Sequence, residues 1–259
     1  MKHSIVIVLI GFIFLFSSCE KVINIDLKND VPRLVIEGKV DDSGNPATVT
    51  ISKSAVFSAG NNYPKVSVAT VTITDNLGTI FLLPETATGV YSNPTLVGVI
   101  GRTYHLSVEL EGKKYTSSST VPRRVALDSL VLNDEPFGDE DKWVGVAYTD
   151  PIGAGDNIQA IQTINGKADK LTHVANDFYI DGGNTPFFIE SVNTALKIGD
   201  EVKIEFRSID KNVYHYLLGV QNLGYGSNTL PENPESNISG NVLGFFSAHT
   251  TQSKVIIVK

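Results

Sequence analysis

The chain has 259 residues, of which 42% are hydrophobic and 19% charged, and its formal net charge is −7. Val, Ile and Thr together number 71 against 33 for Ala plus Leu, which favours strands because side chains branched at Cβ suit a pleated sheet. This composition excludes a helical bundle, a disordered chain, a collagen-like chain and, with a single cysteine, a disulfide-rich scaffold.

The first residues are typical of an export signal. Met1-Lys2 supplies a positive start, residues 5–16 are an unbroken apolar run, and Ser17-Ser18-Cys19 follows at once. A helix of twelve residues, at a rise of about 1.5 Å each, cannot cross a hydrocarbon core of about 30 Å. Residues 1–18 are therefore predicted to be a signal peptide and not a membrane-spanning anchor.

The only cysteine follows two small residues at the end of this apolar run, which is the arrangement of a bacterial lipoprotein signal. We expect cleavage between Ser18 and Cys19 and acylation of Cys19 by membrane fatty acids such as palmitate. Two or three acyl chains give durable anchoring. An ordinary secretory peptide whose cysteine lies there by chance is the alternative. Residues 19–30 are then a lipid-anchored tether.

Removal of residues 1–18 also removes Lys2, which leaves 20 basic against 28 acidic residues and a net charge of −8. Nucleic-acid binding depends on Lys and Arg that neutralise phosphates. The balance of charge therefore argues against a nucleic-acid partner.

Short strands separated by turn residues follow from residue 31 to residue 122. We expect strands at 34–40, 48–56, 66–74, 79–82, 103–110 and 114–121. The clearest is 103–110, in which Tyr104, Leu106 and Val108 alternate with polar residues, and 114–121 is polar and edge-like. Such a pattern predicts an antiparallel β-sandwich of immunoglobulin-like or transthyretin-like architecture over residues 31–122.

Pro122-Arg123-Arg124 is the expected boundary, and residues 123–259 are predicted to form a second β-rich domain. Strands are expected there at 127–132, 143–148, 158–164, 187–190, 201–207, 242–248 and 254–258. One helix is expected at about 208–223, with Ser208 as its cap and Gly224 after its end. The fold class is therefore mainly β with one α-helix.

The usual signatures of catalysis are missing from the sequence. It has no serine between glycines at nucleophile-elbow spacing, no phosphate-binding glycine loop and no His-Glu-x-x-His zinc helix. Acylation of Cys19 would also remove the only thiol. The histidines are scattered, and we expect His105 and His215 to be solvated surface residues. We therefore expect no catalytic residue and no cofactor.

Two weaker candidates for binding remain. The loop 134–141 carries five carboxylates, so Asp134, Asp139 and Asp141 are candidate ligands of a calcium ion, although a solvated hairpin loop explains the same charges. Tyr179 and Tyr225 lie beside glycines and are candidate exposed aromatics for ligand binding. The competing interpretation is that the aromatic residues of this part fill its core.

Several short segments resemble motifs of a single protein family. They follow one another in the family's order along nearly the whole mature chain. They are 19–27, 34–38, 89–91, 101–106, 148–151, 199–202, 214–217, 237–240 and 244–248. Together they resemble a family of Bacteroidota outer-membrane lipoproteins that carry a domain of unknown function (family 4249). One departure is Asn157-Ile158-Gln159, where the family pattern has aromatics.

The resemblance implies a lipid-anchored protein of the outer membrane beside a TonB-dependent transporter, with a role in nutrient uptake and no catalytic residues to carry over. We expect a ligand-binding or accessory component without catalytic activity. A structural cell-surface adhesin or assembly subunit is the alternative, for which strand donation needs a spare tail at 253–259. An enzyme comes third. Sequence leaves open whether the protein faces the periplasm or the outside.

Overall fold

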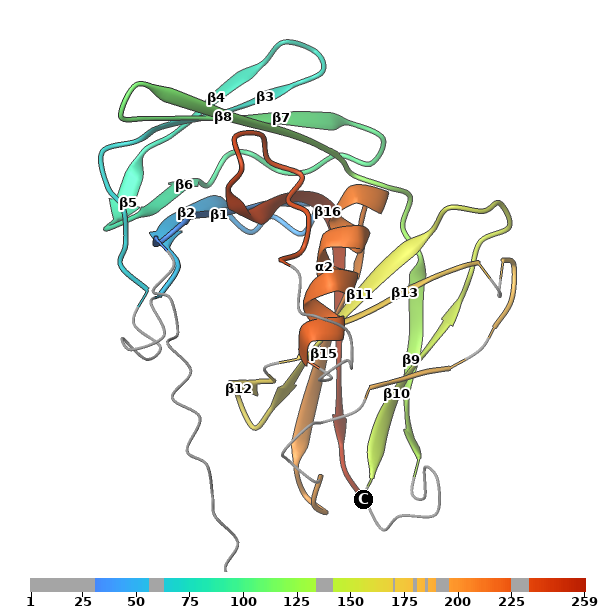
Figure 1. The fold of residues 1–259 in the computed structure, drawn as a ribbon. Coiled ribbons are helices and arrows are strands. Elements are labelled where there is room, and N and C mark those ends of the chain that lie inside the picture. Colours follow the sequence, from blue (N-terminus) through green and yellow to red (C-terminus); the bar gives the residue numbers. More distant parts are fainter. Residues whose placement is uncertain are drawn as a thin grey trace, which may run out of the picture.

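The computed structural model describes residues 31–55, 63–133, 142–169, 171–178, 181–184, 186–189, 196–224 and 233–259. Within these ranges the chain is mainly β with one helix, as predicted (Figure 1). The strands form one nine-stranded, one four-stranded and one three-stranded sheet.

The first half of the chain forms a two-layer sandwich. One layer contains, in sheet order, β4 (Ile80–Leu83), β3 (Thr70–Asp75), β7 (Thr103–Leu110) and β8 (Lys113–Thr120). The other contains β1 (Leu34–Asp41), β2 (Ala47–Lys53), β6 (Val90–Asn93) and β5 (Glu85–Ala87). Alternate side chains such as Ile36, Ile73 and Leu106 are buried between the layers. This period-2 burial is the one expected of strands with one solvated face.

The second half repeats this arrangement with other strands. The three-stranded sheet of β9 (Ala126–Asn133), β10 (Trp143–Thr149) and β14 (Phe187–Ile189) packs on β11 (Asn157–Ile164) and β15 (Glu201–Ser208). β12 (Lys167–Ala168) and β13 (His173–Asn176) both pair with β11. Val144, Ile204 and Phe206 are among the buried residues of this second core.

A single strand, β16 (Leu243–Ile257), belongs to both sandwiches. Residues 243–249 pair in parallel with β1, and residues 250–257 pair antiparallel with β15. In Figure 1 this strand runs from the upper sandwich, past the helix, into the lower one. The prediction of two separate closing strands, at 242–248 and 254–258, is therefore wrong, because residues 250–253 continue the ladder with β15.

The C-terminal segment also contributes to the first core. Ile238, Val242, Phe246 and Ala248 pack among the residues of the first sandwich. By their position in the sequence these residues were expected in the second domain, because a periodicity shows which residues are buried but not against which sheet they pack. The segment 253–257 is paired with β15 and is no spare tail for strand donation.

The helix α2 (Lys211–Gly224) begins later than predicted. Ser208 ends β15 and does not cap the helix; its Oγ accepts the Val125 N–H at 2.9 Å. Asp210 is the cap, because its Oδ1 accepts the N–H groups of Asn212 and Val213, each at 3.0 Å. The helix buries Val213 and Leu217 in a third, smaller cluster that includes Val174 and is flanked by Phe245.

Candidate functional site

The site residues predicted from sequence lie outside the described residues. These are Ser18, Cys19, Asp134, Asp139, Asp141, Tyr179 and Tyr225. His105 on β7 and His215 on α2 are exposed, as predicted. The structure brings together two other groups of polar residues.

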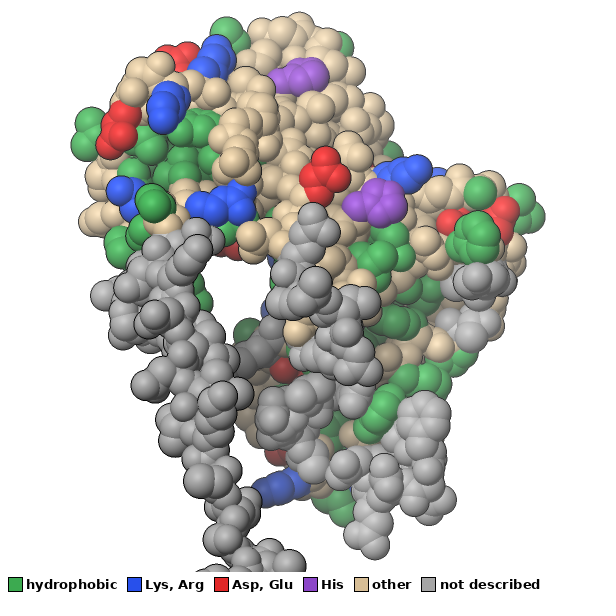
Figure 2. Space-filling view, in the orientation of Figure 1, with side chains coloured by type: hydrophobic (Ala, Val, Ile, Leu, Met, Phe, Trp, Pro, Cys, Tyr) green, Lys and Arg blue, Asp and Glu red, His purple; other side chains and the backbone are tan. Residues whose placement is uncertain are grey.

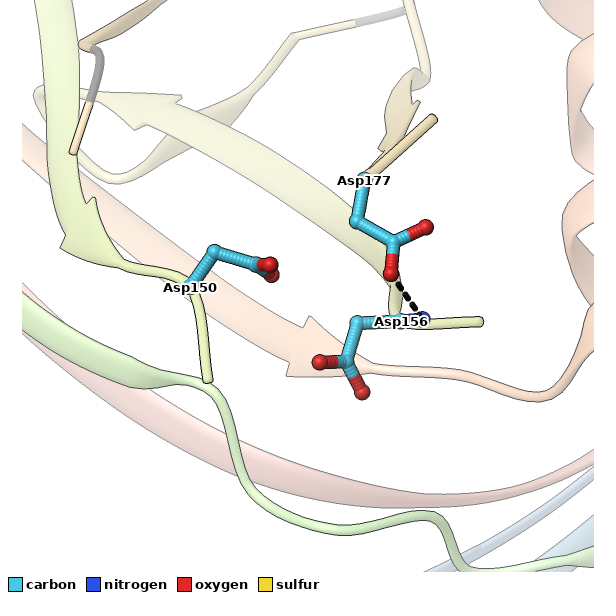
Figure 3. Close-up of side chains that lie close together, drawn as sticks. All are labelled: Asp150, Asp156 and Asp177. Atoms are coloured by element: carbon cyan, nitrogen blue, oxygen red, sulfur yellow. Dashed lines mark hydrogen bonds between the residues drawn. The ribbon is translucent and has the colours of Figure 1, made fainter. Parts of the chain in front are cut away.

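The first group is a cluster of three buried aspartates. Asp150 follows β10, Asp156 precedes β11, and Asp177 follows β13. Each offers a carboxylate oxygen within 4.8 Å of the others (Figure 3), and each residue is at most 7% exposed. The cluster therefore joins three segments that lie apart in the sequence.

Backbone N–H groups and one guanidinium hold the aspartates in place. Asp177 Oδ2 accepts the N–H groups of Gly155 at 2.6 Å and Asp156 at 3.0 Å, and Asp150 Oδ2 accepts that of Gly182 at 3.0 Å. Arg123 pairs with Asp156, its Nη2 lying 2.6 Å from Oδ2.

The same guanidinium also binds the loop between Asp150 and Asp156. Arg123 donates to the carbonyl oxygens of Pro151 at 2.9 Å and Ile152 at 3.0 Å, and to that of Gly153. The loop therefore surrounds the guanidinium. Through these contacts Arg123, which precedes β9, is attached to the loop that precedes β11.

The carboxylates perturb one another electrostatically. Burial raises the pKa of Asp150, the Gly182 N–H lowers it, and the charges of Asp156, Asp177 and Asp181 raise it further. Burial, and then the charges of Asp150 and Asp177, raise the pKa of Tyr148 to about 12. Carboxylates at this spacing have the chemistry to hold a hard cation. Here Arg123 supplies a positive charge from the chain itself.

No sequence pattern predicts this cluster. Asp150 belongs only to the segment 148–151 of the family resemblance, and Asp156 and Asp177 belong to no predicted motif. The sole local signal is the pair of aspartates that bracket the glycine-rich run of residues 151–155. Only the pairing of β11 with β13 brings Asp177 to that run.

The second group lines a pocket of about 280 Å³ on the face of the large sheet opposite the first core. Its walls include Glu37 and Lys39 of β1, Thr50 of β2, Arg207 of β15, and Phe245 and His249 of β16. These strands are neighbours only because β16 lies between β1 and β15. A larger hollow of about 710 Å³ lies over β7, β8 and residues 236–239 and is lined mainly by hydroxyl side chains.

Hydrogen bonds within the chain join the walls of that larger hollow. Ser117 Oγ donates to the Asn237 carbonyl at 2.7 Å, and Ser239 Oγ accepts the Thr116 N–H at 2.8 Å. These bonds attach the C-terminal segment to β8. The smaller pocket is lined by two cationic side chains and a buried histidine, so it offers more charged groups to a ligand than the larger hollow does.

The charged side chains on the face drawn in Figure 2 are scattered and of both signs. They do not gather into one basic patch of the kind that nucleic acid requires. In the described ranges, no helix is both long and apolar enough to span a bilayer.

By its fold the chain is a mainly β protein of two sandwiches that share one strand, with one helix among the described residues. The chain belongs to the family described as "Domain of unknown function (DUF4249)", whose profile matches residues 20–255. A search of curated proteins gives no match.

Among solved structures, a segment of two fibronectin type-III domains from chicken tenascin is 14% identical, and the match covers 88% of this chain and 100% of that one with a TM-score of 0.25. A cytokine receptor complex is 11% identical, with coverage of 86% and 95% and a TM-score of 0.27. At such TM-scores these likenesses carry no functional argument.

Proposed function

We propose that this chain is a lipid-anchored protein of the outer membrane, without catalytic activity, that binds a ligand or assists a neighbouring TonB-dependent transporter in nutrient uptake. The observation that carries the anchor is the apolar run of residues 5–16 followed directly by Ser17-Ser18-Cys19, with no other cysteine in the chain. Resemblance to a lipoprotein family supports the transporter partnership.

The β architecture is compatible with this role. Fold alone does not determine function, so the proposal depends on sites and partners and not on the sandwich. Binding residues in such proteins are commonly carried by a rigid scaffold, which the large shared sheet supplies.

The anchor is tested by substitution of the single cysteine. Cells that express the wild-type chain or the Cys19→Ser variant are grown with labelled palmitate, and their outer membranes are isolated. We expect the label and membrane retention in the wild type and loss of both in the variant, since acyl chains supply the membrane affinity. If the wild type takes up no palmitate label and both proteins are retained in the membrane to the same extent, the lipid anchor is refuted.

The partnership is tested separately. The protein is extracted from native outer membranes in gentle detergent and captured, and the captured proteins and small molecules are identified by mass spectrometry. We expect a TonB-dependent transporter to co-purify with the wild type. Cys19→Ser is the matched control for contacts that need the anchor. If repeated captures of the acylated protein never contain a transporter, the accessory role is abandoned.

A further inference from the structure

The pocket between β1, β2, β15 and β16 is lined by two cationic side chains and a buried histidine. Strand alternation explains its composition, because Ile36 and Val40 of β1 point into the first core while Glu37 and Lys39 lie on the opposite face. On β16, Phe246 and Ala248 likewise enter the core, and Phe245 and His249 line the pocket.

His249 is the most unusual of these residues. It is completely buried, and its Nδ1 lies 3.0 Å from Ser247 Oγ, but its Nε2 has no hydrogen-bond partner among the described residues. Burial, and next the charge of Arg207, lower the pKa of His249 to about 3, so the imidazole is neutral at physiological pH.

Arg207 is held in position beside this histidine. Its Nη2 lies 2.5 Å from a Glu205 carboxylate oxygen, and its Nη1 donates to Gln159 Oε1 at 3.3 Å. A guanidinium has five N–H donors, so these contacts leave donors for a further acceptor. The side chain is 14% exposed, and its orientation is fixed before any ligand arrives.

Lys39 supplies the second cation. It is exposed and forms no ion pair with another described residue. Among the charged side chains of the lining, Lys39 and Arg207 are cationic and Glu37, which is exposed, is the single carboxylate, while Glu205 outside the lining pairs with Arg207. Oxyanions satisfy such donors with several lone pairs at once.

We propose that this pocket binds a small organic anion, whose carboxylate or phosphate oxygens accept hydrogen bonds from Lys39 and Arg207, while the buried His249 imidazole lies behind them as part of the pocket wall. Phe245 offers the carbon part of the ligand an apolar wall, and Glu37 can accept an N–H or O–H group of the same molecule. This inference rests on the ligand-binding part of the proposed function, but it stands without the transporter.

The test is a titration of the full chain in mild detergent, labelled with ¹⁵N-histidine and followed by NMR of the imidazole nitrogens. The probes are inorganic phosphate, succinate and, as a neutral polar ligand, glucose. We expect a saturable shift of the His249 signal with phosphate or succinate, and none with glucose. The exposed His105 and His215 are internal references.

Substitution separates this pocket from general charge effects. Lys39→Gln is expected to raise the dissociation constant of the responding anion at least tenfold, because the exposed side chain is removed without disturbing the core. Lys254→Gln removes an exposed lysine of β16 outside the pocket and is expected to leave the constant unchanged.

A response to succinate alone identifies a carboxylate ligand, and a response to phosphate alone identifies a phosphate group; either supports the proposal. No shift of the His249 signal with either anion overturns it, as does an equal shift with glucose or equal weakening by the two lysine variants. Because the titration needs no partner protein, its failure is distinguishable from a failed capture of a transporter.

Discussion

Gly244 of β16 lies opposite Ile36 of β1 in the shared sheet, with no room for a side chain. Its φ is 95°, and a Cβ atom built there would lie 2.0 Å from the carbonyl oxygen of Ile36. Such a contact is far inside van der Waals distance, so another side chain requires the two strands to separate. The parallel pairing of β1 with β16 therefore depends on glycine at this position.

The Gly244→Ala variant is expected to lower the free energy of unfolding by about 2 kcal/mol or more, because overpacking adds to the strain of a positive φ. Chemical denaturation followed by circular dichroism measures the loss. Gly199→Ala is the matched control, since its φ is 93° but no atom lies within 4 Å. It should lose only about 1 kcal/mol; an equal loss in both variants would contradict the role of the Ile36 contact.

Asp150 makes stability depend on pH in the direction opposite to most carboxylates. Its pKa is raised above the usual 3.8, so the folded chain holds the proton more tightly than the unfolded chain does. The resulting stabilisation is fully present below the unfolded pKa and is lost as pH rises through the folded pKa. The ionised carboxylate is thus unfavourable at neutral pH.

The Asp150→Asn variant is therefore expected to be more stable than the wild type at pH 7 and equally stable at pH 3. An amide oxygen can still accept the Gly182 N–H. Denaturant titrations at the two pH values measure the difference. Asp156→Asn is the contrasting variant: it weakens the pair with Arg123 and should lower stability at pH 7 by about 1–3 kcal/mol. A loss of stability in both variants at pH 7 would argue against repulsion between Asp150 and the neighbouring aspartates.

At the scale of elements, the start of α2 depends on one side chain. Asp210 caps the helix through Oδ1 and accepts the Ser119 hydroxyl through Oδ2, so it also ties the helix to β8. Ser119 Oγ in turn accepts the Ala248 N–H at 2.7 Å. Asp210 and Ser119 therefore link the helix α2, the edge strand β8 and the shared strand β16.

Asp210→Ala is expected to lower the free energy of unfolding by about 0.5–2 kcal/mol, because two helix N–H groups lose their acceptor. Asp210→Asn keeps the acceptor and should lose clearly less. Thermal unfolding followed at 222 nm, with helix content read from the native spectrum, compares the three proteins. Equal stability of the alanine variant and the wild type would show that the cap contributes nothing.

Strands with strict alternation were predictable from sequence. Residues 103–110 form β7 as expected, because Tyr104, Leu106 and Val108 repeat every second residue. The strand expected at 66–74 begins only at Thr70, since Val68 adopts a φ of 67° that no extended strand contains. Thr250 to Ser253 are polar enough to suggest an interruption, although they pair continuously with β15.

The aspartate cluster and the pocket beside His249 were not predictable from the sequence, for a different reason. Asp150, Asp156 and Asp177 come together through loops and the pairing of β11 with β13, and no local spacing encodes that meeting. His249 and Arg207 share a pocket only because β16 changes partner along its length. Periodicity reports which face of a strand is apolar, but it does not identify the strand's neighbours.

At the scale of the whole molecule, the first sandwich is incomplete without the end of the chain. Phe246 and Ala248 fill its core, and β16 covers the edge of β1. The strands before residue 122 leave that edge and that part of the core open. An isolated sandwich therefore lacks both a hydrogen-bonding neighbour and apolar contacts.

A fragment of residues 31–122 is accordingly expected to unfold without a cooperative transition, whereas the same fragment joined through a flexible linker to residues 236–249 should unfold cooperatively. Circular dichroism during heating distinguishes the two. A linked fragment with Phe246→Ser is the control for the apolar contact. A fragment of residues 31–122 that melts cooperatively at the midpoint of the linked form would refute the dependence on β16.

The shared strand also has a consequence for biogenesis. Synthesis delivers β1 early and its parallel partner about 200 residues later along the chain. The edge of β1 stays unpaired until residues 243–249 have been made, and the same fifteen-residue strand then completes both sandwiches. A prematurely terminated chain would leave neither sandwich complete, so we expect a truncated product to be degraded more readily than the full chain.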